Sequence, residues 1–301
     1  MYPFLENSFV SASIGFIFGA VLGSFINVCA HRIPLGKSIV LPPSSCPHCQ
    51  NLIPWHQNLP LLTWILQVGK AKCCSFKIPP RYFLVELVTA IIFSFFCYQA
   101  ASSGTWAMSL VGCIFSFLMI TVVVIDLETM TIPDRFSIGG ALLGLILSTL
   151  IPSIHSLEGT GTEMRMSSFF TSITGLLIGS SILYWIGAIG YRIFGREALG
   201  EGDVKLLGCI GAFCGWKGAV FSIFGGAMLG CLLMLPLMAY GKIRNFYGNR
   251  EGNNQNLQWG QEIPFGPYLA CAALLYWVGL DALAEDWFSF KMIPLIENIS
   301  Y

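Results

Sequence analysis

Long uninterrupted apolar runs dominate this 301-residue sequence and limit the folds that it can adopt. The first run, residues 9–30, contains no charged side chain and is long enough to cross a bilayer as a helix. Charged residues make up 11% of the chain, against about 25% in an ordinary soluble domain. We therefore expect an all-α polytopic membrane protein, because helices satisfy their own backbone hydrogen bonds within lipid.

The apolar runs predict about eight transmembrane helices, the first of which covers residues 9–30. The others are expected near residues 83–101, 106–125, 136–152, 168–190, 204–215, 218–240 and 264–283. The sixth is shorter than the roughly 20 residues that a span needs, so it must extend or the bilayer must thin around it. We expect residues 83–283 to form the transmembrane core, residues 241–262 a flexible loop within it, and residues 284–301 a C-terminal tail.

Residues 31–82 form the one sizeable polar insertion, which lies between the first two predicted spans. It is rich in proline, cysteine and lysine, and its apolar stretch at residues 59–68 is too short to cross a bilayer. We expect the insertion to be a small domain on one side of the membrane. The sequence shows no evident internal repeat.

Basic residues predict the orientation, because cytoplasmic segments carry an excess of lysine and arginine. With the N-terminus outside, thirteen of the 16 lysines and arginines fall in cytoplasmic segments, and the other three are Arg165, Lys217 and Lys291. This arrangement places the insertion on the cytoplasmic side. The net charge of zero gives no indication of a nucleic-acid partner.

Two acids are expected at the cytoplasmic ends of spans. Asp126 directly follows an apolar run, and Asp203 follows Gly200-Glu201-Gly202, where glycine allows a sharp bend and the close approach of another chain. Two carboxylates held close together can supply one protonated and one ionised group, as peptide hydrolysis requires. From the residues alone, interfacial capping or ion pairs with Arg135 and Lys205 remain an alternative. A channel or transporter is disfavoured, because an ion path needs polar groups near the membrane midplane.

Four cysteines of the insertion form a candidate zinc site, namely Cys46, Cys49, Cys73 and Cys74. Cys46-Pro47-His48-Cys49 has the spacing at which two thiolates bind one tetrahedral ion. Cys73 and Cys74 are adjacent, so they complete the site only if the backbone turns, and His48 is another possible ligand. A bound zinc ion would be structural, and a metal-free loop is the alternative.

Six motifs occur in one order across about residues 15–275. They are Gly23-Ser24-Phe25-Ile26-Asn27-Val28 with His31-Arg32-Ile33-Pro34, Cys46-Pro47-His48-Cys49, Pro80-Arg81-Tyr82 with Leu84-Val85-Glu86, Asp126 with Ile132-Pro133-Asp134, Gly200-Glu201-Gly202-Asp203-Val204-Lys205, and Ile263-Pro264-Phe265-Gly266-Pro267. In these motifs the chain resembles the type IV prepilin peptidases, intramembrane aspartyl proteases with a Gly-x-Gly-Asp motif.

The resemblance implies an aspartic endopeptidase in the bacterial inner membrane with Asp126 and Asp203 as its catalytic acids. Its substrates would be type IV prepilins or type II secretion pseudopilins, cut on the cytoplasmic side after a glycine and usually before a phenylalanine. Membrane lipid would surround it. The resemblance also implies N-methylation of the new N-terminus with S-adenosyl-L-methionine, an activity associated with the insertion. A peptidase without methyl transfer is the alternative.

The chain departs from the family at the second cysteine pair. The family's second Cys-x-x-Cys falls on Ala71 and Cys74 here, so one cysteine is displaced. Two further polar residues have open roles. Glu86 either serves the methyl-transfer region or pairs with Arg81, and Asn27 either lines a substrate groove or bonds a neighbouring helix.

Overall fold

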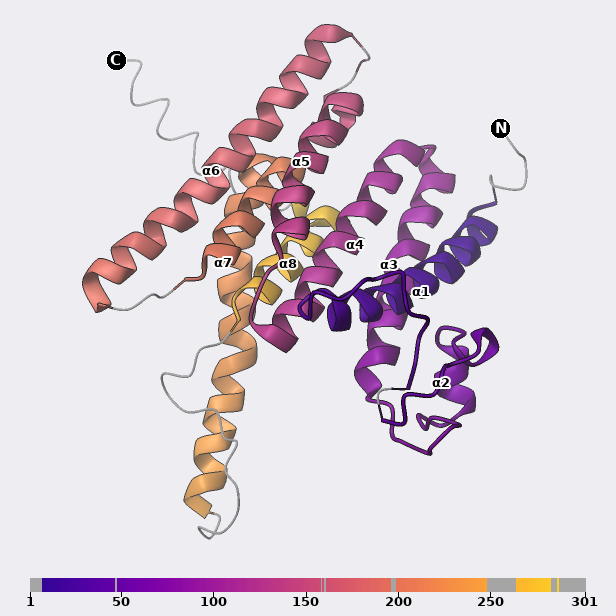
Figure 1. Ribbon diagram of the computed structural model, residues 1–301. Helices are drawn as coiled ribbons and strands as arrows, with labels where there is room; N and C mark the ends of the chain where they lie inside the picture. Colours follow the sequence, from indigo (N-terminus) through magenta and orange to yellow (C-terminus); the bar gives the residue numbers. More distant parts are fainter. Residues whose placement is uncertain are drawn as a thin grey trace, which may run out of the picture. The chain divides into compact units, whose positions relative to one another are not determined.

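The computed structural model describes residues 7–46, 48–157, 159, 161–195, 199–247, 264–282 and 286, with side chains for all of these except 238–247. Its elements are α1 (Ser8–Arg32), η1 (Trp55–Gln57), α2 (Leu62–Leu66), α3 (Pro80–Ser103), α4 (Trp106–Thr129), α5 (Asp134–Leu150), η2 (Pro152–His155), α6 (Thr162–Phe194), α7 (Glu201–Tyr247), α8 (Gly266–Leu275) and η3 (Tyr276–Leu280) (Figure 1). The described residues form no strand beyond two isolated bridges, which confirms the all-α prediction.

Five of the described helices are long and apolar enough to cross a membrane: α1, α3, α4, α6 and α7. The protein is therefore a multi-pass membrane protein. The predicted span at 136–152 corresponds to α5, whose 17 residues rise only about 26 Å, less than a hydrocarbon core of about 30 Å. The predicted last span corresponds to α8 continued by η3, which is also short.

The two predicted spans at 204–215 and 218–240 both fall within α7. Its two helical segments meet at Gly215, whose φ of 67° and ψ of −178° break the helix without a loop. α7 continues to Tyr247, so residues 241–247 are helical rather than part of the predicted loop, because no proline or pair of turn residues interrupts them before Gly248-Asn249. The rest of that loop, and the predicted tail except for Asp286, lie outside the described residues.

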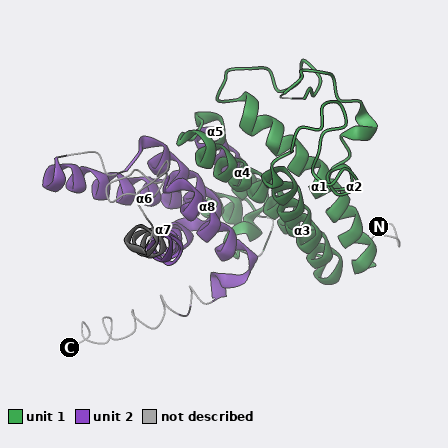
Figure 2. Ribbon diagram, turned by 90° about the horizontal axis from the view of Figure 1, so that it is seen from below, with its two compact units in different colours: residues 1–136, 146–168 green, residues 137–145, 169–301 purple. Residues whose placement is uncertain are grey.

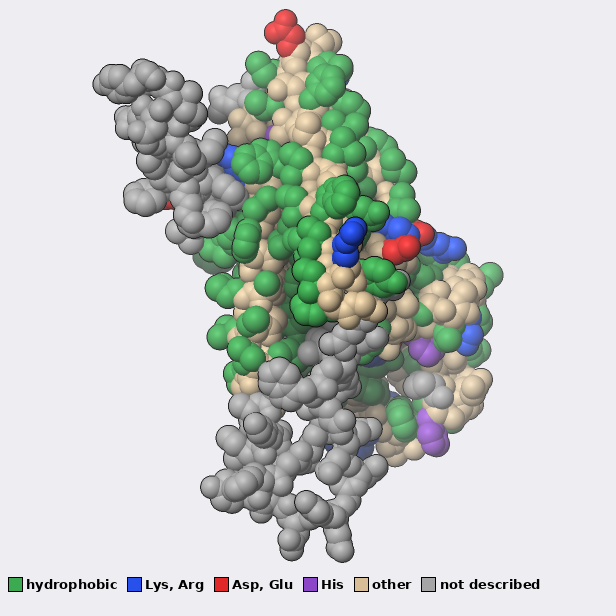
Figure 3. Space-filling view, turned by 90° about the vertical axis from the view of Figure 1, so that its left-hand side faces the viewer, with side chains coloured by type: hydrophobic (Ala, Val, Ile, Leu, Met, Phe, Trp, Pro, Cys, Tyr) green, Lys and Arg blue, Asp and Glu red, His purple; other side chains and the backbone are tan. Residues whose placement is uncertain are grey.

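The chain divides into two compact units, one of residues 1–136 with 146–168 and one of residues 137–145 with 169–301 (Figure 2). In the first unit α1, α3 and α4 pack on one another. In the second unit α7 packs on α8. Many apolar side chains on the helices are exposed, and they cover much of the face drawn in Figure 3, as expected of surfaces that contact lipid.

Glycines four residues apart bring α1 against α3 in the first unit. A Cβ atom added to Gly15 would lie 2.7 Å from the carbonyl oxygen of Phe93, and one added to Gly19 would lie 2.8 Å from the Cα atom of Ala90. One added to Gly23 would lie 2.6 Å from the Cα atom of Glu86. These separations are too short for any side chain, so the two backbones touch directly, as small residues allow in membrane helices.

Close backbone packing at glycines also joins α6 to α7 in the second unit. A Cβ atom on Gly175 would collide with the carbonyl oxygen of Gly211, and one on Gly179 would lie 2.8 Å from the carbonyl oxygen of Leu207. The hydroxyl of Ser172 adds a hydrogen bond of 2.6 Å to the carbonyl oxygen of Ala212. Close backbone packing and a hydrogen bond thus replace the hydrophobic effect, which lipid does not supply between helices.

The polar insertion is attached to the first unit through α2 and the residue before it. Leu61 is buried against Ala20 of α1 and Ala90 of α3, and the Trp64 ring stacks on Phe83 with the ring centroids 4.9 Å apart. The insertion also contains two similar turns, closed by bridges between Ser45 and Leu52 and between Lys70 and Lys77. This similarity lies in the backbone and leaves few identical residues, which is why no internal repeat is evident in the sequence.

Candidate active site and cysteine cluster

Asp126 lies in the last turn of α4, in the first unit, with 4% of its surface exposed. Its carbonyl oxygen accepts the N–H of Met130 at 2.9 Å, and Met130, at a φ of 51°, ends the helix. No ion pair to Asp126 occurs among the described residues, so the alternative of a pair with Arg135 finds no support there. The negative end of the α4 dipole lies beside this carboxyl group.

Asp203 lies in the first turn of α7, in the second unit, and is 8% exposed. Its N–H donates to the carbonyl oxygen of Gly200 at 3.2 Å, which closes the turn that the glycines of this motif form. The positive end of the α7 dipole lies beside the carboxyl group. The two predicted acids are thus both buried at helix ends, and their electrostatic surroundings are opposite.

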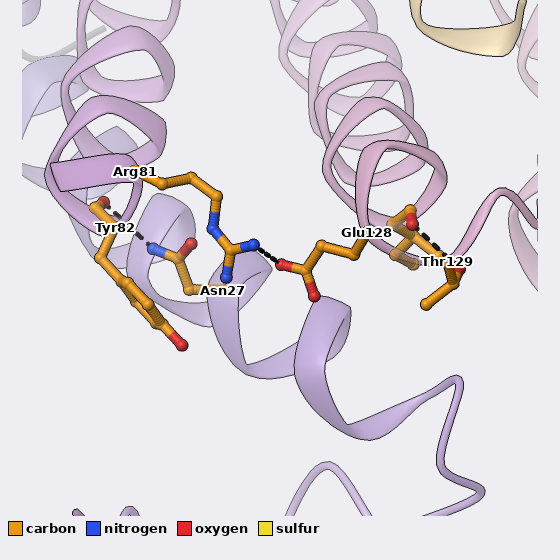
Figure 4. Close-up of polar contacts among 6 residues, drawn as sticks. Asn27, Arg81, Tyr82, Glu128 and Thr129 are labelled. Atoms are coloured by element: carbon orange, nitrogen blue, oxygen red, sulfur yellow. Dashed lines mark hydrogen bonds and ion pairs between the residues drawn. The ribbon is translucent and has the colours of Figure 1, made fainter. Parts of the chain in front are cut away.

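A polar cluster joins α1, α3 and α4 at the end where Asp126 lies (Figure 4). Arg81 of α3 forms an ion pair with Glu128 of α4, and its guanidinium lies 5.1 Å from the centroid of the Tyr82 ring. The side-chain amide of Asn27 donates to the carbonyl oxygen of Tyr82 at 3.2 Å. Asn27 therefore forms a hydrogen bond to a neighbouring helix, which is one of the two roles expected for it. Glu128 was missed in the sequence, although it is an acid only two residues after Asp126.

Glu86 does not pair with Arg81. A carboxylate oxygen of Glu86 instead accepts the backbone N–H of Leu61 at 2.8 Å, and this bond joins α3 to the insertion. Glu86 is 9% exposed, so the hydrogen bond is sheltered from water. Leu61 adopts a φ of 61°, an unusual value for a residue with a side chain, and the bond holds this bend in place. The insertion is thereby fixed to the helix bundle by a polar contact as well as an apolar one.

The four cysteines of the insertion come together as predicted. Their sulfur atoms all lie within 4.8 Å of one another, with Cys46 to Cys74 at 3.6 Å, Cys49 to Cys73 at 3.3 Å and Cys73 to Cys74 at 3.8 Å. Four thiolates around a zinc ion at about 2.3 Å would be about 3.8 Å apart. The cluster therefore fits one tetrahedral ion. His48 lies apart from it, stacked on Phe76 with the ring centroids 5.1 Å apart.

The thiol groups differ in their readiness to bind a metal. The backbone N–H groups of Cys49 and His48 lower the pKa of Cys46 to about 6, because they stabilise its thiolate. The neighbouring Cys49 thiol raises the pKa of Cys73 to about 12. A divalent cation would displace the protons from the thiol groups that it binds.

Comparison with known proteins shows which family the chain belongs to. Residues 17–100 match the profile of the bacterial peptidase A24 N-terminal domain, and residues 113–235 match that of the type IV leader peptidase family. A prepilin leader peptidase/N-methyltransferase of Myxococcus xanthus is 32% identical over 83% of this chain and 69% of its own. A protein of the same name from Klebsiella pneumoniae is 34% identical over 72% of this chain and 88% of its own. The chain belongs to the type IV leader peptidase family.

A third relative, from Escherichia coli, is named a type 4 prepilin-like proteins leader peptide-processing enzyme, and is 35% identical over 68% of this chain and 77% of its own. No solved structure matches the chain significantly. Asp126 and Asp203 both fall within the segment that matches the leader peptidase family, and the four cysteines fall within the segment that matches the N-terminal domain. The acids and the cysteines of this chain therefore lie in two separate matching segments.

Proposed function

We propose that this protein removes the leader peptides of type IV prepilins or pseudopilins, with Asp126 and Asp203 as its two catalytic acids. The observation that carries the proposal is the position of these acids. Each is buried at a helix end, and both lie inside the segment that matches the leader peptidase family. The relatives named above are prepilin leader peptidases, which supports the same substrate class.

The two acids divide the hydrolysis between them. One ionised carboxylate takes a proton from water, and the attacking oxygen adds to the peptide carbonyl. The other, protonated, polarises the carbonyl and then gives its proton to the leaving amine. The opposite helix ends beside Asp126 and Asp203 suit such a pair, because they favour different charge states. No metal ion enters these steps.

The orientation of the protein follows from its basic residues. The protein spans the bacterial inner membrane with its N-terminus outside, and the insertion and both acids lie on the cytoplasmic side. A prepilin would enter as a membrane helix, so that its leader emerges at the lipid boundary beside the acids. We expect the cut to follow a glycine and to precede a phenylalanine.

The cysteine cluster binds one structural zinc ion through Cys46, Cys49, Cys73 and Cys74 in this proposal. The fit of the sulfur positions to a tetrahedron supports it. The ion would fix the fold of the insertion and supplies no chemistry to the hydrolysis.

Methylation of the newly exposed N-terminus is the second proposed activity, since the relatives are also named N-methyltransferases. S-adenosyl-L-methionine would be the methyl donor. The described residues form no strand-turn-helix cradle of the kind that holds an adenosyl group. Mass spectrometry of a mature pilin N-terminus tests the activity, because a methyl group adds a fixed mass and an unmodified residue would leave a peptidase only.

The peptidase proposal is tested with purified protein and a prepilin that carries a Gly-Phe junction. Asp126→Asn and Asp203→Asn should each slow leader cleavage by about 10²–10⁴-fold, because each removes one proton-transfer group. Asp134→Asn and Glu201→Gln are matched controls, since they remove exposed acids near each site and should cleave at the normal rate. If either of the first two variants cleaves at the wild-type rate, the two-acid proposal is wrong.

A further inference from the structure

The two turns of the insertion repeat one another at a fixed offset. Lys70 follows Ser45 by 25 residues, and Lys77 follows Leu52 by the same 25, so the two bridges are equivalent. We refer to residues 44–54 as the first turn and residues 69–79 as the second turn. Each turn ends in Ile-Pro, and a helix starts directly after each proline, η1 after the first turn and α3 after the second.

The backbone hydrogen bonds of the two turns are equivalent at the same offset. The three pairs are Ile53 N–H to Ser44 O (2.9 Å) and Ile78 N–H to Gly69 O (2.7 Å), Cys46 N–H to Asn51 O (2.9 Å) and Ala71 N–H to Phe76 O (2.8 Å), and Gln50 N–H to Cys46 O (2.9 Å) and Ser75 N–H to Ala71 O (2.8 Å). The left-handed residue of each turn also matches, with a φ of 61° at Gln50 and 56° at Ser75. Two unrelated loops would not agree at every bond, so the residues can be equated one by one.

This equivalence shows where the second turn departs from the first. Cys49 and Cys74 occupy the same position, as do Cys46 and Ala71. The methyl group of Ala71 cannot bind a metal ion, so the second turn lacks one ligand at the position where the first turn has one. Cys73 instead occupies the position of His48, two residues further along.

The Cys73 side chain nevertheless reaches the cluster. Its sulfur lies 3.3 Å from that of Cys49 and 3.8 Å from that of Cys74, both within the range for ligands of one tetrahedral ion. The residue at the same position of the first turn, His48, turns away and stacks on Phe76. A side chain at the position shared by His48 and Cys73 therefore need not point toward the other sulfur atoms. The Cys73 side chain does so, and the His48 side chain does not.

We propose that Cys73 is a relocated ligand, which completes a four-thiolate zinc site in place of the ligand absent from position 71. The site is consequently asymmetric, because the first turn supplies Cys46 and Cys49 with two residues between them, whereas the second supplies the adjacent Cys73 and Cys74. Cys73 is also the exposed corner of the site, whereas Cys46 is 2% exposed. This inference rests on the proposed zinc site and adds the reason why Cys73, rather than residue 71, is one of its ligands.

A transplanted cysteine tests the proposal in the full-length protein. Cys73→Ala should weaken zinc binding by at least about 100-fold, since loss of a ligand should exceed the effect of losing an outer contact. The double variant Cys73→Ala with Ala71→Cys should recover affinity to within about tenfold of wild type, because the equivalent position then carries the thiol. Zinc affinity is measured by competition with a chromophoric chelator, and Co²⁺ substitution reports the number of thiolates through the sulfur-to-cobalt absorption band.

His48→Ala is the matched control, because it alters the equivalent position of the first turn and should leave the zinc affinity unchanged. Unchanged affinity and an unchanged cobalt spectrum in Cys73→Ala would overturn the role of Cys73. A double variant that stays folded but does not recover would overturn the equivalence of the two turns. Wild-type protein without zinc would overturn the metal proposal itself, while leader cleavage in the same preparation would leave the peptidase proposal standing.

Discussion

The helix bundle of the first unit and the polar insertion attached to it are stabilised in different ways. In the bundle, α1, α3 and α4 bury long apolar faces and bring backbones into contact at Gly15, Gly19 and Gly23. Between α1 and α3, only three of the described insertion residues are buried, namely Cys46, Leu61 and Gly69. So small an apolar core does not offset the conformational entropy of an ordered loop. The proposed zinc ion would therefore have to supply the stability that packing does not give the insertion.

Removal of the proposed zinc ion should produce the largest difference in stability between the insertion and the bundle. A structural zinc ion contributes on the order of 10 kcal/mol to the folding of a small domain, so a strong chelator should unfold the insertion. The bundle should keep its helices, because its packing does not involve the cysteines. Limited proteolysis should then cut within residues 33–79 while circular dichroism changes little. A loss of most helical signal on chelation would show that the two regions are not independent.

Widening the contact between α1 and α3 should have the next largest effect, and it should leave the zinc content of the insertion unchanged. Gly19→Ala places a Cβ atom 2.8 Å from the Cα atom of Ala90, so the helices must separate, at a cost of about 1–3 kcal/mol. Gly139→Ala is the control, because nothing lies within 4 Å of its added Cβ atom and alanine favours a helix by about 1 kcal/mol. The thermal unfolding temperature in detergent should fall for Gly19→Ala and rise slightly for Gly139→Ala, with the zinc content equal in both variants.

Glu86 tests the link between the two regions. Glu86→Ala leaves the buried N–H of Leu61 without an acceptor, which should cost about 1–3 kcal/mol. Glu86→Gln keeps an acceptor oxygen and should cost less. Proteolysis of the insertion should accelerate in Glu86→Ala although zinc remains bound. Equal cleavage rates in wild type and Glu86→Ala would mean that the apolar contact of Leu61 is sufficient.

The smallest predicted effect concerns His155 in η2, whose ring is buried away from water. Burial lowers the pKa of His155 to about 4, so the folded state favours the neutral ring. Stability is then fully present above the ordinary pKa of about 6.5 and declines as the pH falls below it, by about 0.8 kcal/mol at pH 6. His155→Gln should remove this decline from unfolding curves at pH 8 and pH 6. An identical pH dependence in both proteins would mean that the ring charges freely.

The bundle was largely predictable from the sequence, and the insertion was not. Hydropathy places the helices because lipid demands long apolar segments, and the acids were found because charges are rare among them. The Gly15-Gly19-Gly23 spacing also carried a readable signal of close helix packing, which was missed. The contact of Glu86 with Leu61 crosses 25 positions and leaves no local pattern.

The repeat in the insertion escaped for a related reason. It consists of backbone hydrogen bonds, and its two copies share no identical residues beyond Ile-Pro and one cysteine. The break at Gly215 falls at the boundary between the predicted spans 204–215 and 218–240, but the sequence did not show that the two helical segments meet there without a loop.

The most direct test of the account concerns Asp126 and Asp203 as a single catalytic pair. Leader cleavage is measured for Asp126→Asn, Asp203→Asn and the double variant. Groups that act as one unit are not additive, so the double variant should be no slower than the slower single variant. A double variant whose loss equals the product of the two single losses would contradict the account, because the two acids would then act independently.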